Sequence, residues 1–289
     1  VNGTEVTVTY EGEGTENNPY VINGTNEEML AELQAIGKNE TTLKSEYYAL
    51  GSNIDASETA NWNDGIGFIP LGNGSVPFEF GGFDGKNHSI DGLFINESSE
   101  LHVGLFGKSF GSEFENIRLT NLNITGNQRV GGLVGTFDRG NIENPLRNVV
   151  ISGSVSSGFT GTGGVVGSLE GGGELKTLKF TGSASTGGNV GGLIGQSSSL
   201  VTIRNSSVIA DSIEGGDNFG VGGLVGSPQN QVTIFDSYAQ IQDMRQLPSG
   251  AGSGTVHGLV GKGEGELTNT YVIINGSIGN LGNTGSAAD

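Results

Sequence analysis

The chain has 289 residues, a formal net charge of −18 and no cysteine. The missing cysteines exclude disulfides, thiolate metal sites and cysteine nucleophiles. A surface this acidic repels phosphates and anionic lipids, and no run approaches the roughly 18 apolar residues of a membrane-spanning helix, so we predict no nucleic-acid partner and no membrane insertion. Glycine supplies 54 residues, where average usage gives about 20. Without a Gly-X-Y period, this excess indicates many tight turns between short strands rather than collagen.

The N-terminal region is predicted to contain one strand and one helix. Val6 and Val8 alternate with polar residues, as in a strand with one buried face. The helix begins at Thr25, which forms a capping box with Glu28, and it ends before Gly37. We expect this helix to cover the open end of a β-structure, which would otherwise expose strand edges and an apolar core.

A motif of two glycines around two apolar residues recurs six times from residue 104 onward, at intervals of 28 to 35 residues. Intervals that vary while the motif holds place the variation in loops. One repeat cannot bury its own apolar pair, but a stack of repeats makes one continuous core, and the glycines permit left-handed turns or close backbone approach. The motifs are Gly104-Leu105-Phe106-Gly107, Gly132-Leu133-Val134-Gly135, Gly164-Val165-Val166-Gly167, Gly192-Leu193-Ile194-Gly195, Gly223-Leu224-Val225-Gly226 and Gly258-Leu259-Val260-Gly261.

A second pattern follows each motif: after 11 to 16 residues, a polar residue opens a strand of alternating apolar residues such as Val149 and Ile151. We expect the polar side chains to hydrogen-bond their equivalents one coil away, at the strand spacing of about 4.8 Å. These residues are therefore predicted to form a structural ladder. Its members are Asn116, Asn148, Thr177, Asn205, Asp236 and Asn269.

Together the two patterns predict an all-β fold: a right-handed parallel β-helix with one N-terminal capping helix. Residues 1–63 are assigned to the capping region and residues 64–289 to the β-helix. Residues 64–95 lack the full motif but carry coil-like strands, and we expect two or three further coils there.

The VGGLVG units at 130–135, 190–195 and 221–226 resemble the GLUG motif. The leader is similar as well, with YYALGSNIDAS at 47–57 and GGFDGKNHSIDGL at 81–93. The GLUG motif is found in bacterial and archaeal cell-surface proteins, including filamentous-haemagglutinin-like adhesins and the non-catalytic regions of streptococcal immunoglobulin A peptidases. The resemblance implies a β-helix at a cell surface. The zincin signature His-Glu-X-X-His is absent from the chain, so the peptidase activity is not carried over.

Few residues suggest chemistry. Asp84 and Asp91 flank a histidine in FDGKNHSIDG and could hold a cation or a sugar, but Asp-Gly pairs are more typical of turns whose carboxylates cap backbone amides. Trp62 with the pair Tyr47 and Tyr48 could form a sugar-stacking platform, although packing beside the capping region is the simpler interpretation. The three histidines show no metal spacing. We therefore predict no catalytic residue, no cofactor and no metal site.

Nine Asn-X-Ser/Thr sequons suggest a glycosylated exterior. The alternative is that these residue types merely abound in β-turns. The candidate glycosylation sites are Asn2, Asn23, Asn39, Asn73, Asn87, Asn96, Asn123, Asn205 and Asn275.

We predict a non-catalytic, extracellular or cell-surface β-helix protein that acts in adhesion or surface structure. An unidentified protein or glycan ligand would contact the loops at 156–163, 212–219 and 243–255, which vary in length while the core motif holds. Two alternatives stay open. One is self-association as a subunit of an extracellular filament, sheath or virion fibre, and the other is a polysaccharide-active β-helix enzyme.

Overall fold

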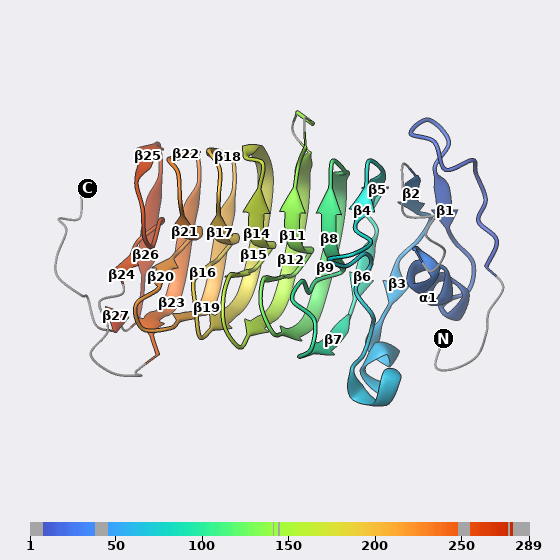
Figure 1. Cartoon of the computed structure of the whole chain (residues 1–289), viewed down its shortest axis with the longest axis horizontal. Helices are drawn as coiled ribbons and strands as arrows, with labels where there is room; N and C mark the ends of the chain where they lie inside the picture. Colours follow the sequence, from blue (N-terminus) through green and yellow to red (C-terminus); the bar gives the residue numbers. More distant parts are fainter. Residues whose placement is uncertain are drawn as a thin grey trace.

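The chain forms one elongated stack of β-strand coils, with residues 20–22 near one end and residues 265–274 at the other (Figure 1). The computed structural model describes residues 8–37, 46–140, 142–143, 145–247, 255–276 and 278–279. All pairs between its named strands are parallel, and each strand pairs with the equivalent strand of the next coil. The predicted parallel β-helix is confirmed.

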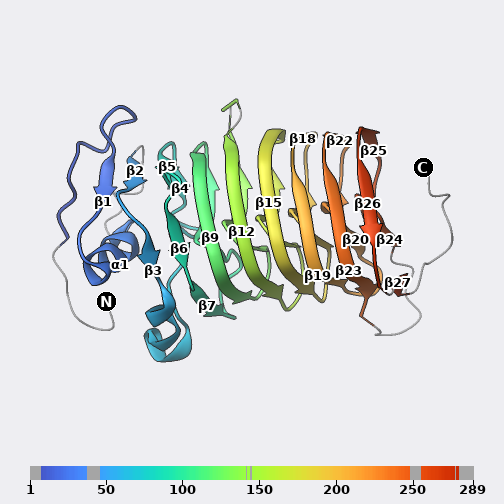
Figure 2. The same ribbon diagram turned by 180° about the vertical axis from the view of Figure 1, so that it is seen from behind.

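Three sheets run along the stack and are here called sheets 1, 2 and 3. Sheet 1 has 16 strands and lies in front in Figure 2. Its strands are β1 (Tyr20–Ile22), β2 (Tyr47–Leu50), β3 (Ile54–Asp55), β5 (Gly82–Asp84), β6 (Ser89–Asp91), β7 (Phe94–Glu97), β9 (Glu113–Gly126), β12 (Leu146–Ser157), β15 (Gly173–Thr186), β18 (Val201–Arg204), β19 (Ser207–Gly215), β22 (Val232–Phe235), β23 (Tyr238–Gln246), β25 (Gly265–Thr268), β26 (Tyr271–Ile274) and β27 (Ile278–Gly279).

Sheets 2 and 3 are shorter and complete the coils. Sheet 2 consists of β4 (Phe78–Glu79), β8 (Phe106–Phe110), β11 (Val134–Asp138), β14 (Val166–Glu170), β17 (Ile194–Ser197) and β21 (Val225–Pro228). Sheet 3 consists of β10 (Val130–Gly131), β13 (Thr162–Gly163), β16 (Val190–Gly191), β20 (Gly220–Gly222) and β24 (Thr255–His257). The four central Gly-Leu-Val-Gly motifs, from Gly132 to Gly226, carry the chain from sheet 3 into sheet 2.

The motif residues of successive coils lie directly over one another. The backbone N–H of Leu133 donates to the carbonyl of Val165 at 3.0 Å, and that of Val165 donates to Leu193 at 3.1 Å. Leu193 donates in turn to Leu224 at 2.9 Å. All four side chains are completely buried in one hydrophobic cluster that reaches from Ile22 to Leu259. The stack therefore has the continuous interior that the repeat predicts.

The repeat glycines are required by close approach of neighbouring coils. A Cβ atom built on Gly192 would lie 2.3 Å from the carbonyl oxygen of Gly223, and one on Gly164 would lie 2.3 Å from the ring of Phe180. None of the glycines in the six motifs has a positive φ. The sequence offered two reasons for the motif glycines, which were close approach of the backbone and left-handed turns. The structure shows the close approach and no left-handed backbone at these positions.

Left-handed backbone occurs instead at the six ladder residues, whose φ values lie between 48° and 55°. Asn116 Nδ2 donates to Asp84 Oδ1 at 3.0 Å, and Asn148 Nδ2 donates to Asn116 Oδ1 at 2.8 Å. Further along, Asn269 Nδ2 donates to Asp236 Oδ1 at 2.5 Å. The column thus combines a bend in each coil of sheet 1 with side-chain contacts between coils.

Between these contacts, two buried serines connect the coils through their hydroxyls. Ser206 Oγ accepts from the backbone N–H of Leu178 at 3.1 Å, and Ser237 Oγ accepts from the N–H of Ser206 at 3.0 Å. Each serine immediately follows a ladder residue. In this part of the stack, the hydrogen bond between coils is therefore made by the serine and not by the ladder side chain.

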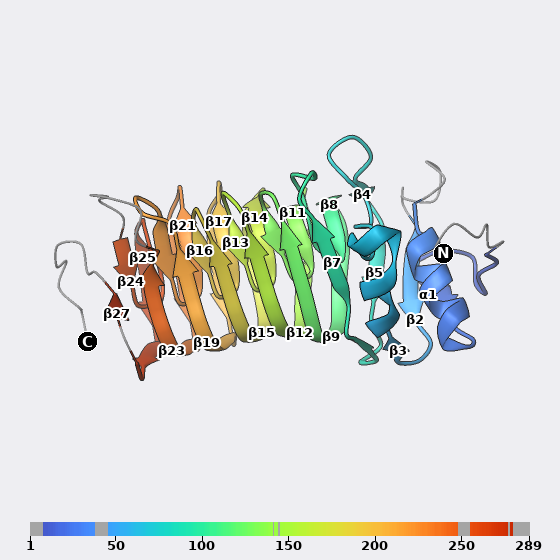
Figure 3. The same ribbon diagram turned by 90° about the horizontal axis from the view of Figure 1, so that it is seen from below.

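Helix α1 (Asn26–Ala35) covers the N-terminal end of the stack (Figure 3). Its predicted capping box between Thr25 and Glu28 is present, and its apolar face is buried. Gln34 joins the helix to the segment before β4, because its side-chain amide donates to Ile69 O at 3.0 Å and accepts from Ile69 N at 2.9 Å. The capping helix is therefore confirmed.

Two details of the N-terminal region differ from expectation. Val8 belongs to no strand, and Val6 lies outside the described residues. Strands β1 and β2 already continue sheet 1 upstream of residue 64. A lobe of 3-10 turns, η1 (Ser57–Asn61) and η2 (Asn63–Gly65), projects from the lower edge in Figure 1.

Candidate ligand-binding cleft

A cleft of about 180 Å³ lies on the outer face of sheet 1, near the edge where the chain turns from sheet 2 into sheet 1. Strands β2, β5, β9 and β12 form its floor, and the loop before β1 forms one wall. Its lining residues are Glu16, Asn17, Pro19, Tyr47, Tyr48, Gly82, Phe83, Asp84, Lys86, Glu113, Glu115 and Arg147.

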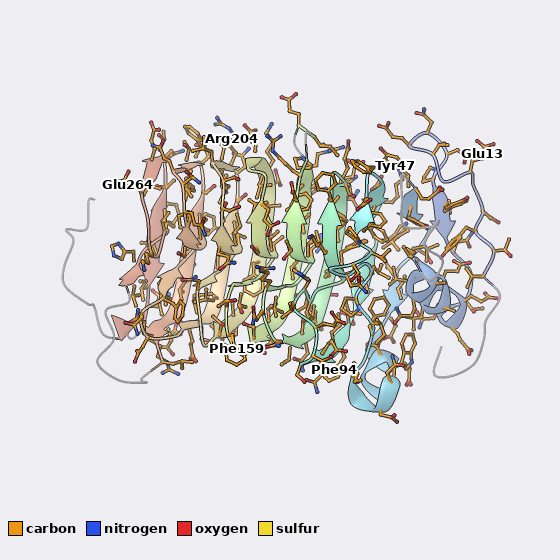
Figure 4. The ribbon with its side chains drawn as sticks, viewed as in Figure 1. Glu13, Tyr47, Phe94, Phe159, Arg204 and Glu264 are labelled. Atoms are coloured by element: carbon orange, nitrogen blue, oxygen red, sulfur yellow. The ribbon has the colours of Figure 1, made fainter. Side chains whose placement is uncertain are left out.

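The cleft exists because one outward-facing column of sheet 1 lacks a side chain. Tyr47 pairs with Gly82, and Gly82 pairs with Glu113. The ring of Tyr47 fills part of the gap: a Cβ atom on Gly82 would lie 2.5 Å from its Cδ1 atom. The ring therefore lies over the glycine backbone, at the upper edge of the molecule where Figure 4 labels it.

A second outward-facing column, formed by Asp84, Glu115 and Arg147, carries the charges of the cleft. Asp84 Oδ2 pairs with Lys86 Nζ at 2.7 Å, and Asp84 Oδ1 accepts from the backbone N–H of Lys86 and from Asn116. Burial alone would raise the pKa of Asp84, but these hydrogen bonds outweigh it and hold that pKa below its usual value. Asp84 is therefore a fixed carboxylate at neutral pH.

Arg147 ties both columns together across β9. Its Nη2 atom lies 2.9 Å from Glu115 Oε2, and its Nη1 atom lies 3.5 Å from Glu113 Oε2. Burial raises the pKa of the Tyr47 hydroxyl, and the nearby carboxylates of Glu113 and Glu16 raise it further. The cleft thus presents a neutral phenol beside a network of fixed charges.

Of the three predicted platform aromatics, Tyr47 alone faces outward. Tyr48 is 1% exposed and packs against Phe78 with ring centroids 6.3 Å apart. Trp62 is 6% exposed and stacks on Phe68 at 6.5 Å. Packing therefore explains two of the three rings, and the third belongs to the cleft.

The two aspartates of the predicted acidic cluster are separated by their partners. Asp84 lines the cleft, whereas Asp91 accepts from Thr120 Oγ1 at 2.5 Å and from Asn121 Nδ2 at 2.8 Å. Within the described residues, no group of three His, Cys, Asp or Glu side chains is arranged to hold a metal ion. As predicted for a turn residue, the carboxylate of Asp84 accepts a hydrogen bond from a backbone amide, that of Lys86.

Seven of the nine sequon asparagines are described, and all seven are exposed. Asn2 and Asn39 lie outside the described residues. Glycosylation at these sites stays a prediction.

The loops predicted to contact a ligand lie where the chain leaves sheet 1, opposite the cleft. Figure 4 labels Phe159 of the first loop at the lower edge, and this side chain is 62% exposed. Residues 248–254 of the third loop lie outside the described residues.

Sequence reasoning missed Glu113, Glu115 and Arg147 as residues of the cleft. Glu115 and Arg147 each immediately precede a ladder residue, and this shared position in the repeat would have predicted that they lie in one column.

Known proteins resemble this chain in sequence and in architecture. No family model matches it. It is 39% identical to halomucin of Haloquadratum walsbyi over 174 residues, which are 58% of this chain and 2% of halomucin. It is 29% identical to an immunoglobulin A1 protease of Streptococcus sanguinis over 232 residues, 76% of this chain and 11% of that protein. The resemblance to proteins of the immunoglobulin A peptidase type is thereby confirmed.

A solved structure supports the same fold. The crystal structure of a candidate immunoglobulin A1 protease from Bacteroides ovatus superposes with a TM-score of 0.71 and 22% identity, covering 96% of this chain and 82% of that one. At this identity the likeness shows the fold alone.

None of the helices in the described part of the chain has the length and apolar character needed to cross a bilayer.

Proposed function

We propose that this chain is a non-catalytic module of an extracellular, cell-surface protein and that it acts in adhesion or surface structure. The similarity to halomucin and to small parts of much longer immunoglobulin A1 proteases supports a modular role. The observation that carries the proposal is the construction of sheet 1, where ion pairs join neighbouring coils. Arg147 pairs with Glu115, Arg204 with Glu174, and Arg245 with Glu214. Such a flank would present a row of paired charges to a partner.

The charges of the cleft argue against hydrolysis of a polysaccharide. A glycosidase needs one carboxyl group with a raised pKa to protonate the leaving oxygen, and a second carboxylate opposite it. Lys86 and Asn116 hold Asp84 ionised, and Arg147 engages Glu113 and Glu115. These contacts favour fixed charges over proton transfer.

Two assays on the purified protein test this function together. Beads coated with the chain should adhere to cell or matrix surfaces, while immunoglobulin A1 and a panel of acidic and neutral polysaccharides stay intact with or without calcium. Cleavage of any of these bonds that is abolished by Asp84→Ala or Asp91→Ala would show that the chain is an enzyme.

Self-association is a second candidate, favoured by the C-terminal edge of the stack. Strands β25 and β26 carry exposed Leu267, Tyr271 and Ile273, with exposed fractions of 49%, 53% and 44%. Tyr271 stacks on Tyr238 of the preceding coil at 5.0 Å and nearly parallel. A second copy that adds its own edge would continue this column, as exposed strand edges tend to do.

Light scattering of the purified chain over a range of salt concentrations measures this association. Tyr271→Lys and Ile273→Lys should shift the mass toward monomer, because a charge at the edge opposes strand addition. Phe159→Lys, at a more exposed position away from the edge, should leave the mass unchanged. A monomer under all conditions would eliminate the filament.

A further inference from the structure

The cleft over Gly82 has the features of a sugar-binding subsite. We infer that it binds one pyranose ring of a non-anionic glycan, neutral or amino-bearing, with the ring of Tyr47 as the stacking platform. This inference rests on the proposed surface function and names the chemistry of its ligand.

The first argument is the position of Tyr47. The Cδ1 and Cε1 atoms of its ring lie next to Gly82, where a Cβ atom would be 2.5 Å and 2.7 Å from them, and the side chain is half-buried. The π-face of an aromatic ring is electronegative and attracts the weakly positive C–H groups of a sugar. Tyrosine also offers a hydroxyl, which burial and neighbouring carboxylates keep protonated.

The second argument is the set of polar groups around that ring. The side chains of Asp84, Glu113 and Glu115 are 17%, 30% and 32% exposed, and those of Lys86 and Arg147 are 55% and 37% exposed. Their ion pairs fix acceptors and donors along the floor while leaving part of each side chain accessible. Convergent polar groups in a concave site give orientation to a hydroxyl-rich ligand.

The third argument is charge. Four carboxylates line the cleft, from Glu16, Asp84, Glu113 and Glu115, against the two cations of Lys86 and Arg147. This local excess of negative charge adds to the net charge of −18 of the chain. A uronic acid, sulfated or sialylated ring would be repelled, whereas a neutral or amino sugar would not.

The fourth argument is size. Clefts that enclose drug-sized molecules have volumes of roughly 300–1,000 Å³, and this one has about 180 Å³. It therefore suits a single ring rather than an extended oligosaccharide. Because the cleft opens on the outer face of sheet 1, the rest of the glycan would continue over the sheet surface.

The experiment measures binding of mannotriose, chitotriose, its deacetylated form and trigalacturonate to the purified chain by saturation-transfer NMR and titration calorimetry. We expect the three non-anionic trisaccharides to include at least one ligand, and trigalacturonate to bind more weakly than that ligand. Tyr47→Ala should weaken binding roughly five- to tenfold, the effect of losing one aromatic contact. Tyr47→Trp should retain it.

The controls separate stacking and charge from folding. Tyr271→Ala removes an exposed tyrosine elsewhere on sheet 1 and should leave binding unchanged, although it also removes the stacking on Tyr238. Glu16→Lys, on the exposed rim of the cleft, should reduce the discrimination against trigalacturonate. Melting temperatures of all variants close to that of the parent protein would show that the effects are local.

Three results would overturn the inference. They are binding that is unchanged in Tyr47→Ala, preference for trigalacturonate, and no binding of any non-anionic trisaccharide at millimolar concentration. Adhesion of coated beads that persists in Tyr47→Ala would then keep the surface function while rejecting this ligand. Bond cleavage by the chain would instead reject the proposed function itself.

Discussion

The side-chain amide of Asn148 donates a 2.8 Å hydrogen bond to Oδ1 of Asn116 in the preceding coil, and both residues have left-handed backbone, with φ of 53° and 54°. Asparagine suits both demands. It tolerates left-handed geometry better than other residues with a Cβ atom, and its amide carries a donor and an acceptor for the coils on either side. The left-handed bend within each coil and the side-chain hydrogen bond between coils therefore both favour asparagine.

Thr177 occupies the same column with φ of 55°, where a β-branched side chain is strained. We expect Thr177→Asn to raise the free energy of unfolding by about 1 kcal/mol, because asparagine relieves this strain. Denaturant unfolding of the purified protein measures the change. Thr181→Asn, in the same strand β15 but with ordinary extended backbone, should be neutral or destabilising. Equal gains in both variants would refute the strain at Thr177.

The motif glycines predict a second effect. In Gly192→Ala the new Cβ would lie 2.3 Å from the carbonyl oxygen of Gly223 and 2.6 Å from Val208, so neighbouring coils must separate. We expect a loss of about 3 kcal/mol in the free energy of unfolding, measured by denaturant titration. The control is Gly158→Ala, whose nearest neighbour would be 3.7 Å away; a loss there as large as at Gly192 would contradict the packing argument.

The interior of the fold could be predicted from the sequence, because the repeat and the alternation of Val149 and Ile151 specify which side chains face inward. The conformations were harder to assign. The motif glycines suggested left-handed turns, but none of them has a positive φ, and they are needed instead for close contact between coils. Left-handed backbone occurs at the ladder residues and at glycines outside the motif, such as Gly153 and Gly182. The cleft could not be predicted. Tyr47, Gly82 and Glu113 come from three coils, and their alignment depends on loop lengths that no single repeat encodes.

Two buried serines of the N-terminal coils should respond oppositely to the loss of their hydroxyls. Within the described residues, Ser109 Oγ is buried without a hydrogen-bond partner, whereas Ser112 Oγ donates to Phe78 O at 3.0 Å. Ser109→Ala should raise the free energy of unfolding by about 1 kcal/mol, because it removes an unsatisfied polar group. Ser112→Ala should lower it by a similar amount. Thermal unfolding of the two variants side by side measures the difference, and a loss in Ser109→Ala would reveal a missing partner.

His102 predicts a dependence of stability on pH. The side chain is 8% exposed, and its Nδ1 atom lies 2.8 Å from Thr136 Oγ1. Burial lowers the pKa of His102 to about 4, with help from the charges of Arg129 and Lys108. In the unfolded chain the pKa is near 6.5, so between these values the unfolded state binds the proton and the folded state does not. The free energy of unfolding should therefore fall as the pH drops from 6.5 toward 4.

We expect this fall to amount to about 2 kcal/mol between pH 7 and pH 4.5, with carboxylate effects adding to it at the acid end. Denaturant titrations at a series of pH values measure the slope. His102→Gln should flatten it, because glutamine does not titrate, although the variant is expected to be less stable at pH 7. His257→Gln replaces an exposed histidine in β24 and serves as the matched control, so it should keep the slope. If His102→Gln and the parent protein lose stability in parallel as the pH falls, the imidazole of His102 is already accommodated in its charged form, and burial in the coil does not keep it neutral.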